Sequence, residues 1–165
     1  MKTFCLFFWL AVCPALMAET VMVSIGGEGL ADQADPGYRV CFLALESGVM
    51  DAFFDAGNIV FNDSEFRGSQ DERYRTVRVA REGGASMLLL VRCVYNPDGA
   101  RDWKTGDGAP VGLPEKIFLE YVRVSDFGVV RKLELAPSPR DAARHPAIER
   151  YYIVLGRKAA ENLLK

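Results

Sequence analysis

Apolar and polar positions along the chain follow a pattern that predicts strands and helices in turn. The apolar run Val21–Ile25 predicts a short first strand, which a glycine-rich turn ends. Asp35 and Pro36 then have the residue types of a helix cap and a first helical turn. Apolar residues recur at helical spacing as far as Phe54, and Gly57 is expected to end this helix.

The middle of the chain predicts a second strand, a second helix and a buried third strand. Asn58–Asn62 predicts a short strand, and a more polar helix is expected from about Glu72 to Arg81. Ala85–Tyr95 is almost entirely apolar, which is typical of a central strand covered on both faces. Asn96–Pro110 follows as a long loop rich in turn-forming residues.

The last part of the chain predicts a hairpin and a closing helix. Two strands, Lys116–Ser125 and Val129–Leu135, are joined by a turn at Asp126–Gly128. Apolar residues on one side of the segment Ala147–Leu164 predict the helix. The full pattern predicts an α/β fold, with a single layered domain, a mixed sheet of about five strands and three helices. The predicted order is β-α-β-α-β-β-β-α.

The first eighteen residues differ from the rest and are typical of an export signal. Lys2 is their only charge, and an apolar run follows that is shorter than the about 20 residues needed to span a bilayer. Small residues close the segment at Ala15 and Ala18. We expect residues 1–18 to be a signal peptide and residues 19–165 to form the domain of an exported, periplasmic protein. Cleavage after Ala15 and a buried N-terminal core element are the alternatives.

Cys13 offers a further alternative, because Leu10–Val12 before it resembles a loose lipidation motif. Acylation of Cys13 would anchor the protein to a membrane, and we expect membrane contact only in that case. A lipid-surface protein of this kind would otherwise need an exposed apolar face on the last helix.

The charge balance excludes one class of partner. The chain has 20 Lys and Arg against 22 Asp and Glu, which gives a formal net charge of −2. Basic and acidic residues are interleaved, so no broad basic surface is expected and nucleic acid is not an expected partner.

The candidate chemical motifs are incomplete, so we expect no cofactor, no metal site and no enzymatic activity. Gly26–Gly29 lacks the further residues of a phosphate-binding loop and is expected to be a turn. Asp126–Gly128 is interpreted as a hairpin turn, and His145, the only histidine, as a surface or capping residue. The alternative is a small periplasmic hydrolase whose carboxylates only a structure would bring together.

Two cysteines lie outside the N-terminal segment, Cys41 and Cys93. In an oxidising compartment they are candidates for a disulfide. Both lie in strongly apolar stretches, where free cysteine behaves as a small apolar residue. The two interpretations stay open.

The long loop is the candidate site for function. It carries Arg101 and Trp103, and Tyr95 precedes it. These are residue types enriched at the centres of protein interfaces. We expect them to contact a partner, another envelope protein; the alternative is that Trp103 folds back onto the domain.

The order of elements resembles a group of exported bacterial domains. A helix such as Leu43–Ala56 is followed by a short strand such as Asn58–Asn62, and a second helix precedes an apolar strand such as Met87–Tyr95. This arrangement is similar to the N-terminal domain of the Tol-Pal β-propeller protein, to the lipoprotein activators of penicillin-binding proteins and to the curli secretion lipoprotein. The resemblance implies a non-catalytic envelope module that acts by binding other proteins.

Overall fold

The structure is a computed structural model that describes residues 18–30, 35–62 and 70–165. Of the predicted signal segment, only Ala18 is among the described residues, so Cys13 and Ala15 lie outside them. In chain order the elements are β1 (Thr20–Glu28), α1 (Pro36–Asp55), β2 (Ile59–Asn62), α2 (Gln70–Glu82), β3 (Met87–Val94), β4 (Trp103–Lys104), β5 (Pro110–Val111), β6 (Lys116–Arg123), β7 (Val129–Leu135), α3 (Pro139–Ala142) and α4 (Ile148–Leu164).

Five of the strands form one mixed sheet in the order β2-β1-β3-β6-β7. β1 is parallel to β2 and to β3, whereas β3–β6 and β6–β7 are antiparallel. The prediction of a mixed five-stranded sheet is therefore confirmed, and so is the central position of β3. β4 and β5 form a separate two-stranded sheet.

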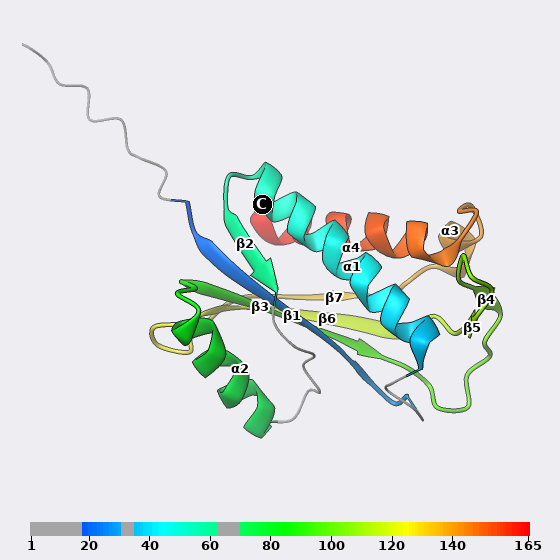
Figure 1. The fold of residues 1–165 in the computed structure, drawn as a ribbon, viewed down its shortest axis with the longest axis horizontal. Helices are drawn as coiled ribbons and strands as arrows, with labels where there is room; N and C mark the ends of the chain where they lie inside the picture. Colours follow the sequence, from blue (N-terminus) through cyan, green and yellow to red (C-terminus); the bar gives the residue numbers. More distant parts are fainter. Residues whose placement is uncertain (1–17, 31–34, 63–69) are drawn as a thin grey trace, which may run out of the picture.

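Helices cover the two faces of the sheet unequally (Figure 1). α1 and α4 lie side by side on one face, and α2 lies on the other. The two parallel connections cross the sheet in opposite directions, so two right-handed crossovers place α1 and α2 on opposite faces. The larger apolar core lies between the sheet and α1 with α4, and a smaller one lies beneath α2.

The two ends of the molecule carry different elements (Figure 1). We call the end at which the chain enters β1 the proximal end. The helices α1, α2 and α4 finish there, and the turn between β6 and β7 lies there too. At the distal end α1 and α4 begin, and the β4–β5 hairpin lies against that end.

The limits of α1 follow from its sequence as predicted. The side chain of Asp35 caps the helix by accepting a hydrogen bond from the backbone N–H of Gly37 at 2.9 Å, and Pro36 occupies the first turn. After Asp55 the chain leaves the helix through Gly57, whose φ is 87°. This is the left-handed region that glycine adopts at low cost.

Two glycines let α1 and α4 approach each other closely. A Cβ atom added to Gly48 of α1 would clash with the carbonyl oxygen of Ile153, and one added to Gly156 of α4 would clash with that of Leu45. Both obstacles are backbone atoms, which cannot move aside as a side chain can. The absence of a Cβ at Gly48 and Gly156 therefore sets the distance between the two helices.

The structure corrects the prediction in three places. Gly26–Gly29 was expected to be a turn. Instead, β1 continues through Gly26 and Gly27 to Glu28, and these residues pair with the last residues of β3. Gly27 fits there because a Cβ atom would lie 2.7 Å from the ring of Phe42. The long loop contains the short strands β4 and β5, and the chain break before the last helix forms the extra helix α3. The described residues thus hold four helices rather than three.

None of the helices within the described ranges is long and apolar enough to cross a membrane. The longest of them, α1, has 20 residues, and half of these are buried against the sheet and α4.

Replacing Gly156 with alanine is expected to destabilise the fold by about 1–3 kcal/mol, because the added methyl group forces α1 and α4 apart. The sign is informative, since alanine in an unconstrained helix would gain about 1 kcal/mol over glycine. Urea unfolding measures the effect, with Ser47→Ala on the exposed side of α1 as the control. A Gly156→Ala variant as stable as the parent would contradict the close approach.

Candidate functional site

The structure places Tyr95 in the core, which corrects its assignment to a partner-binding surface. Its side chain is only 4% exposed, and its hydroxyl lies 3.2 Å from that of Tyr152. Its ring meets that of Tyr38 edge-on at 4.9 Å. The cause is the pleat of the strand: Tyr95 follows Cys93 by two residues, so it points to the same side, toward α1 and α4.

Arg101 is exposed and joins the long loop to the start of α1. Its Nη1 lies 3.0 Å from Oδ2 of Asp35, the residue that caps the helix. Its guanidinium carbon also lies 5.4 Å from the centre of the Tyr38 ring. Arg101 is therefore available at the surface but already has two partners within the chain.

Trp103 is half-buried and folds back onto the domain. It pairs with Val111 in the β4–β5 hairpin and packs against the larger core. This is the alternative that the sequence left open. Its main role in the structure is to hold the hairpin against the body, so a substitution of Trp103 would disturb packing as well as any contact with a partner.

Polar contacts fix the loop at its two sides. The backbone N–H of Gly112 donates to the Tyr38 hydroxyl of α1 at 3.1 Å. On the other side, the backbone N–H of Gly106 donates to Oε1 of Glu149, in the first turn of α4, at 2.6 Å. Inside the hairpin, the N–H of Ala109 donates to the Thr105 hydroxyl at 2.9 Å. The loop is thus held by α1, by α4 and by itself.

Residues 96–102 form the longest continuous exposed stretch of this loop. The side chain of Asn96 begins it by accepting a hydrogen bond from the N–H of Asp98 at 3.0 Å, which makes a local turn. The exposed segment therefore starts from a defined turn and ends at the packed Trp103.

Cys41 and Cys93 are free thiols, and both are completely buried. The disulfide considered from the sequence is not formed in this structure. Burial raises the pKa of Cys41 to about 12, with smaller contributions from the charges of Glu149 and Asp35. Burial also raises the pKa of Cys93, as well as those of Tyr95 and Tyr152 nearby. These groups are held in their neutral forms, so neither thiol is a nucleophile at neutral pH.

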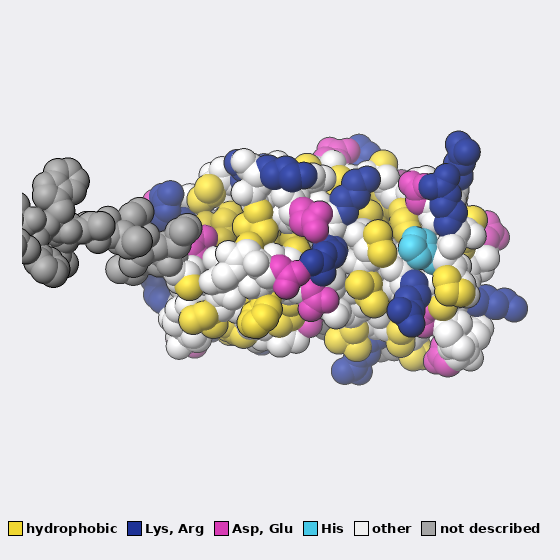
Figure 2. Space-filling model, turned by 90° about the horizontal axis from the view of Figure 1, so that it is seen from above, with side chains coloured by type: hydrophobic (Ala, Val, Ile, Leu, Met, Phe, Trp, Pro, Cys, Tyr) yellow, Lys and Arg dark blue, Asp and Glu magenta, His cyan; other side chains and the backbone are white. Residues whose placement is uncertain are grey.

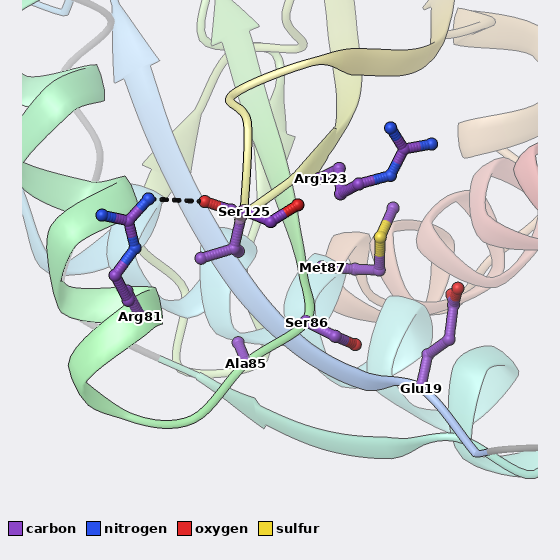
Figure 3. Close-up of a pocket in the computed structure, with 8 residues that line it drawn as sticks. Glu19, Arg81, Ala85, Ser86, Met87, Arg123 and Ser125 are labelled. Atoms are coloured by element: carbon purple, nitrogen blue, oxygen red, sulfur yellow. Dashed lines mark hydrogen bonds between the residues drawn. The ribbon is translucent and has the colours of Figure 1, made fainter.

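A hollow of about 480 Å³ lies at the proximal end, between the start of β3 and the end of β6. Figure 3 shows that its two arginines do not converge, because Arg81 and Arg123 lie on opposite sides of Ser125. Arg81 donates to the backbone carbonyl of Val124 at 2.9 Å, and Arg123 forms an ion pair with Asp126 at 3.0 Å. The arginines here shape the hairpin and do not form a shared anion site.

Glu19 and Ser86, which also line this hollow, are bound within the chain. Oε2 of Glu19 accepts a hydrogen bond from the Tyr121 hydroxyl at 2.6 Å. The Ser86 hydroxyl bridges the backbone of Thr20, accepting from its N–H at 3.2 Å and donating to its carbonyl at 3.3 Å. No arrangement of base and nucleophile follows from these contacts.

A second hollow, of about 310 Å³, contains the residue types of a hydrolytic triad, Ser138, Asp141 and His145. Their contacts are structural. The Ser138 hydroxyl caps α3 by accepting from the N–H of Asp141 at 3.3 Å, and Asp141 pairs with Arg144 at 3.1 Å. His145 is half-buried, with its ring 5.8 Å from that of Tyr151. Within the described ranges, no group of three or more His, Cys, Asp or Glu residues could hold a metal ion.

The comparisons with known proteins give a similarity of fold. No family model matches the sequence, and no curated protein matches it. Among solved structures, PelC from Paraburkholderia phytofirmans, described as a dodecamer, has a TM-score of 0.47 and 19% identity, over 85% of this chain and 82% of that one. Lipoprotein GNA1162 from Neisseria meningitidis has a TM-score of 0.44 and 8% identity, over 88% and 97%. These comparisons do not confirm the resemblance to the Tol-Pal or curli proteins, so that resemblance stays a prediction.

Stability is expected to fall as the pH rises above about 9, because the unfolded chain releases thiol protons that the folded chain keeps. For Cys41 the loss extends from its ordinary pKa of 9.0 to about 12. Between pH 8 and pH 10 the loss is roughly 1 kcal/mol per thiol, measured as the shift in the urea midpoint.

The variant Cys93→Ala, which keeps the other thiol, is expected to show a smaller dependence on pH than the parent. A disulfide between Cys41 and Cys93 would leave the parent no thiol to titrate, and the variant, in which Cys41 is free, would then depend on pH more than the parent does. A pH dependence of the variant equal to or larger than that of the parent would therefore contradict the assignment of two buried free thiols.

Proposed function

We propose that this chain is an exported accessory protein of the cell envelope, which binds another protein and catalyses no reaction. The observation that carries the proposal is the long loop at the distal end. It is held in place by α1 and α4, yet it presents residues 96–102 to solvent. A surface loop ordered by its own domain loses little conformational entropy when a partner binds, which favours recognition.

The composition of the loop is that of a polar interface. Arg101 and Lys104 are exposed and basic, while Asp98, Asp102 and Asp107 supply acidic groups nearby. Charged groups at the edge of an interface guide the approach and orientation of a partner. The half-buried Trp103 supports this surface from below.

The binding role is also supported by the state of the other reactive groups. The two thiols are buried and neutral, and so are Tyr95 and Tyr152. The serine, aspartate and histidine of the second hollow take part in helix capping and packing. Export is supported by the N-terminal sequence, in which one positive charge precedes an apolar run and small residues.

The proposal is tested by crosslinking in living cells with the full chain. Lys104 is replaced by a photoreactive benzoylphenylalanine. The matched control position is Lys158, which is also exposed but lies on α4. Illumination is expected to give one discrete protein adduct from position 104 and none from position 158.

Adding Arg101→Ala is expected to reduce the adduct several-fold while the unfolding free energy changes by less than about 1 kcal/mol, since an exposed ion pair contributes little to stability. Trp103→Ala is unsuitable as the test because it removes packing from the core. The absence of an adduct at position 104, or the same adduct at both positions, would reject the loop as the binding surface.

A further inference from the structure

The proximal end concentrates exposed apolar side chains. Within the described residues, nine large apolar side chains are exposed. Six of them lie at this end of the molecule, on α1, β2, the β6–β7 hairpin and α4: Phe54, Ile59, Phe127, Val129, Val130 and Leu164. A seventh, Tyr74 of α2, contacts Phe127, with the two ring centres 6.2 Å apart. Seen from the α1 and α4 side, apolar side chains are visible at the left, proximal end, and others lie among charged side chains of both signs along the rest of that face (Figure 2).

Hydrogen bonds join the elements of this end, so the apolar side chains have fixed positions relative to one another. The N–H of Ile59 donates to the carbonyl of Glu19 at 2.9 Å, and the N–H of Ser86 donates to that of Thr20 at 2.8 Å. At the other side, Arg131 of β7 donates to the carbonyl of Leu163, near the end of α4, at 2.6 Å. The end is a shared surface of several elements.

Three acidic side chains at this end are bound within the chain. Glu19 is bonded to Tyr121, Asp126 to Arg123, and Asp55 to Arg157. Arg81 stands over the ring of Phe127, with its guanidinium carbon 5.2 Å from the ring centre. Arginine beside an exposed aromatic ring is a pairing suited to the headgroup region of a bilayer, where the ring enters the interface and the guanidinium meets phosphate.

The point at which the N-terminal segment joins the fold supports a lipid bilayer as the occupant of this surface. The chain enters the fold at the proximal end, and Cys13 stands only five residues before Ala18. Five residues span at most about 18 Å when fully extended. Acylation at Cys13 would hold this end against the bilayer, and cleavage after Ala18 would leave the new N-terminus at the same end.

We propose that the proximal end docks on the surface of a lipid bilayer, with Phe54, Ile59 and Phe127 seated among the lipid headgroups. The distal loop then points away from the membrane. This inference does not depend on the protein partner proposed above, since it concerns the opposite end of the molecule and needs only lipid. It goes beyond the expectation from the sequence, in which membrane contact required acylation of Cys13, because the exposed apolar side chains supply a contact of their own.

An environment-sensitive fluorophore attached to a single introduced cysteine tests the proposal. Phe54→Cys places it at the proximal end of α1, and Leu43→Cys is the matched control on the same helix, with native side chains 72% and 54% exposed. The two positions are 11 residues apart, or about 16 Å along the helix. Cys41 and Cys93 are buried and protonated, so they do not take up the label.

The full chain is purified from the envelope of expressing cells, its N-terminus is defined by mass spectrometry, and vesicles of phosphatidylethanolamine and phosphatidylglycerol are added. The label at position 54 is expected to brighten and to be quenched by spin-labelled lipid, while the label at position 43 stays unchanged. No response at either position, or an equal response at both, would overturn the proposed orientation. A label at position 54 that is already shielded without vesicles, in a concentration-dependent way, would assign the surface to a second copy instead.

A second set of variants measures affinity. The triple variant Phe54→Ser, Ile59→Ser, Phe127→Ser is expected to weaken vesicle binding of the non-acylated protein at least about tenfold. The control is Leu43→Ser with Val154→Ser, which removes two exposed apolar side chains outside the proximal end. Because all five side chains are exposed, the fold is expected to survive. Equal loss in both variants would contradict a specific docking surface.

Discussion

The close approach of α1 and α4 at Gly48 and Gly156 is the constraint on which the rest of the structure depends. Each glycine faces the backbone of the other helix, so the two helices form one rigid layer over the sheet. The larger core lies beneath this layer, and it includes the buried tyrosines and both thiols. A wider separation would open this core and would expose polar groups that now satisfy one another, such as the hydroxyls of Tyr95 and Tyr152.

The same helix pair connects the two ends of the molecule. At the distal end, the first turns of α1 and α4 hold the long loop through Asp35, Tyr38 and Glu149. At the proximal end, α1 finishes beside the exposed Phe54, and the last turn of α4 accepts a hydrogen bond from Arg131 of the sheet. One structural unit would therefore keep the proposed partner-binding loop and the proposed membrane-docking surface at a fixed separation.

The sequence predicted the sheet and the three long helices because their signals are local. Helical spacing of apolar residues, the Asp35 cap and Gly57 defined α1, and the apolar run before Tyr95 identified the central strand. The hairpin strand β7 was predicted with its exact bounds, Val129–Leu135. These features need only a few neighbouring residues to be recognised.

The remaining features depend on contacts between distant parts of the chain. Gly48 and Gly156 weaken a helix when judged alone, and only the packing of α1 on α4 explains them. Tyr95 was assigned to a surface because it borders the long loop and belongs to a residue type enriched at interfaces. β3 is apolar on both faces, which hides the alternation that would have placed the Tyr95 side chain inside. β4 and β5 have two residues each, too few for a periodic signal, and they exist because Trp103 packs on the core.

The central claim is that one rigid body works through two opposite ends, and hydrogen exchange tests it most directly. Backbone amide exchange is compared between the purified chain and the chain in isolated cell envelopes. We predict added protection in residues 96–112 and in the proximal segments around positions 54–60 and 126–130, with α1 and α4 between them unchanged. Added protection along the middle of α1 and α4, or none at either end, would contradict the account.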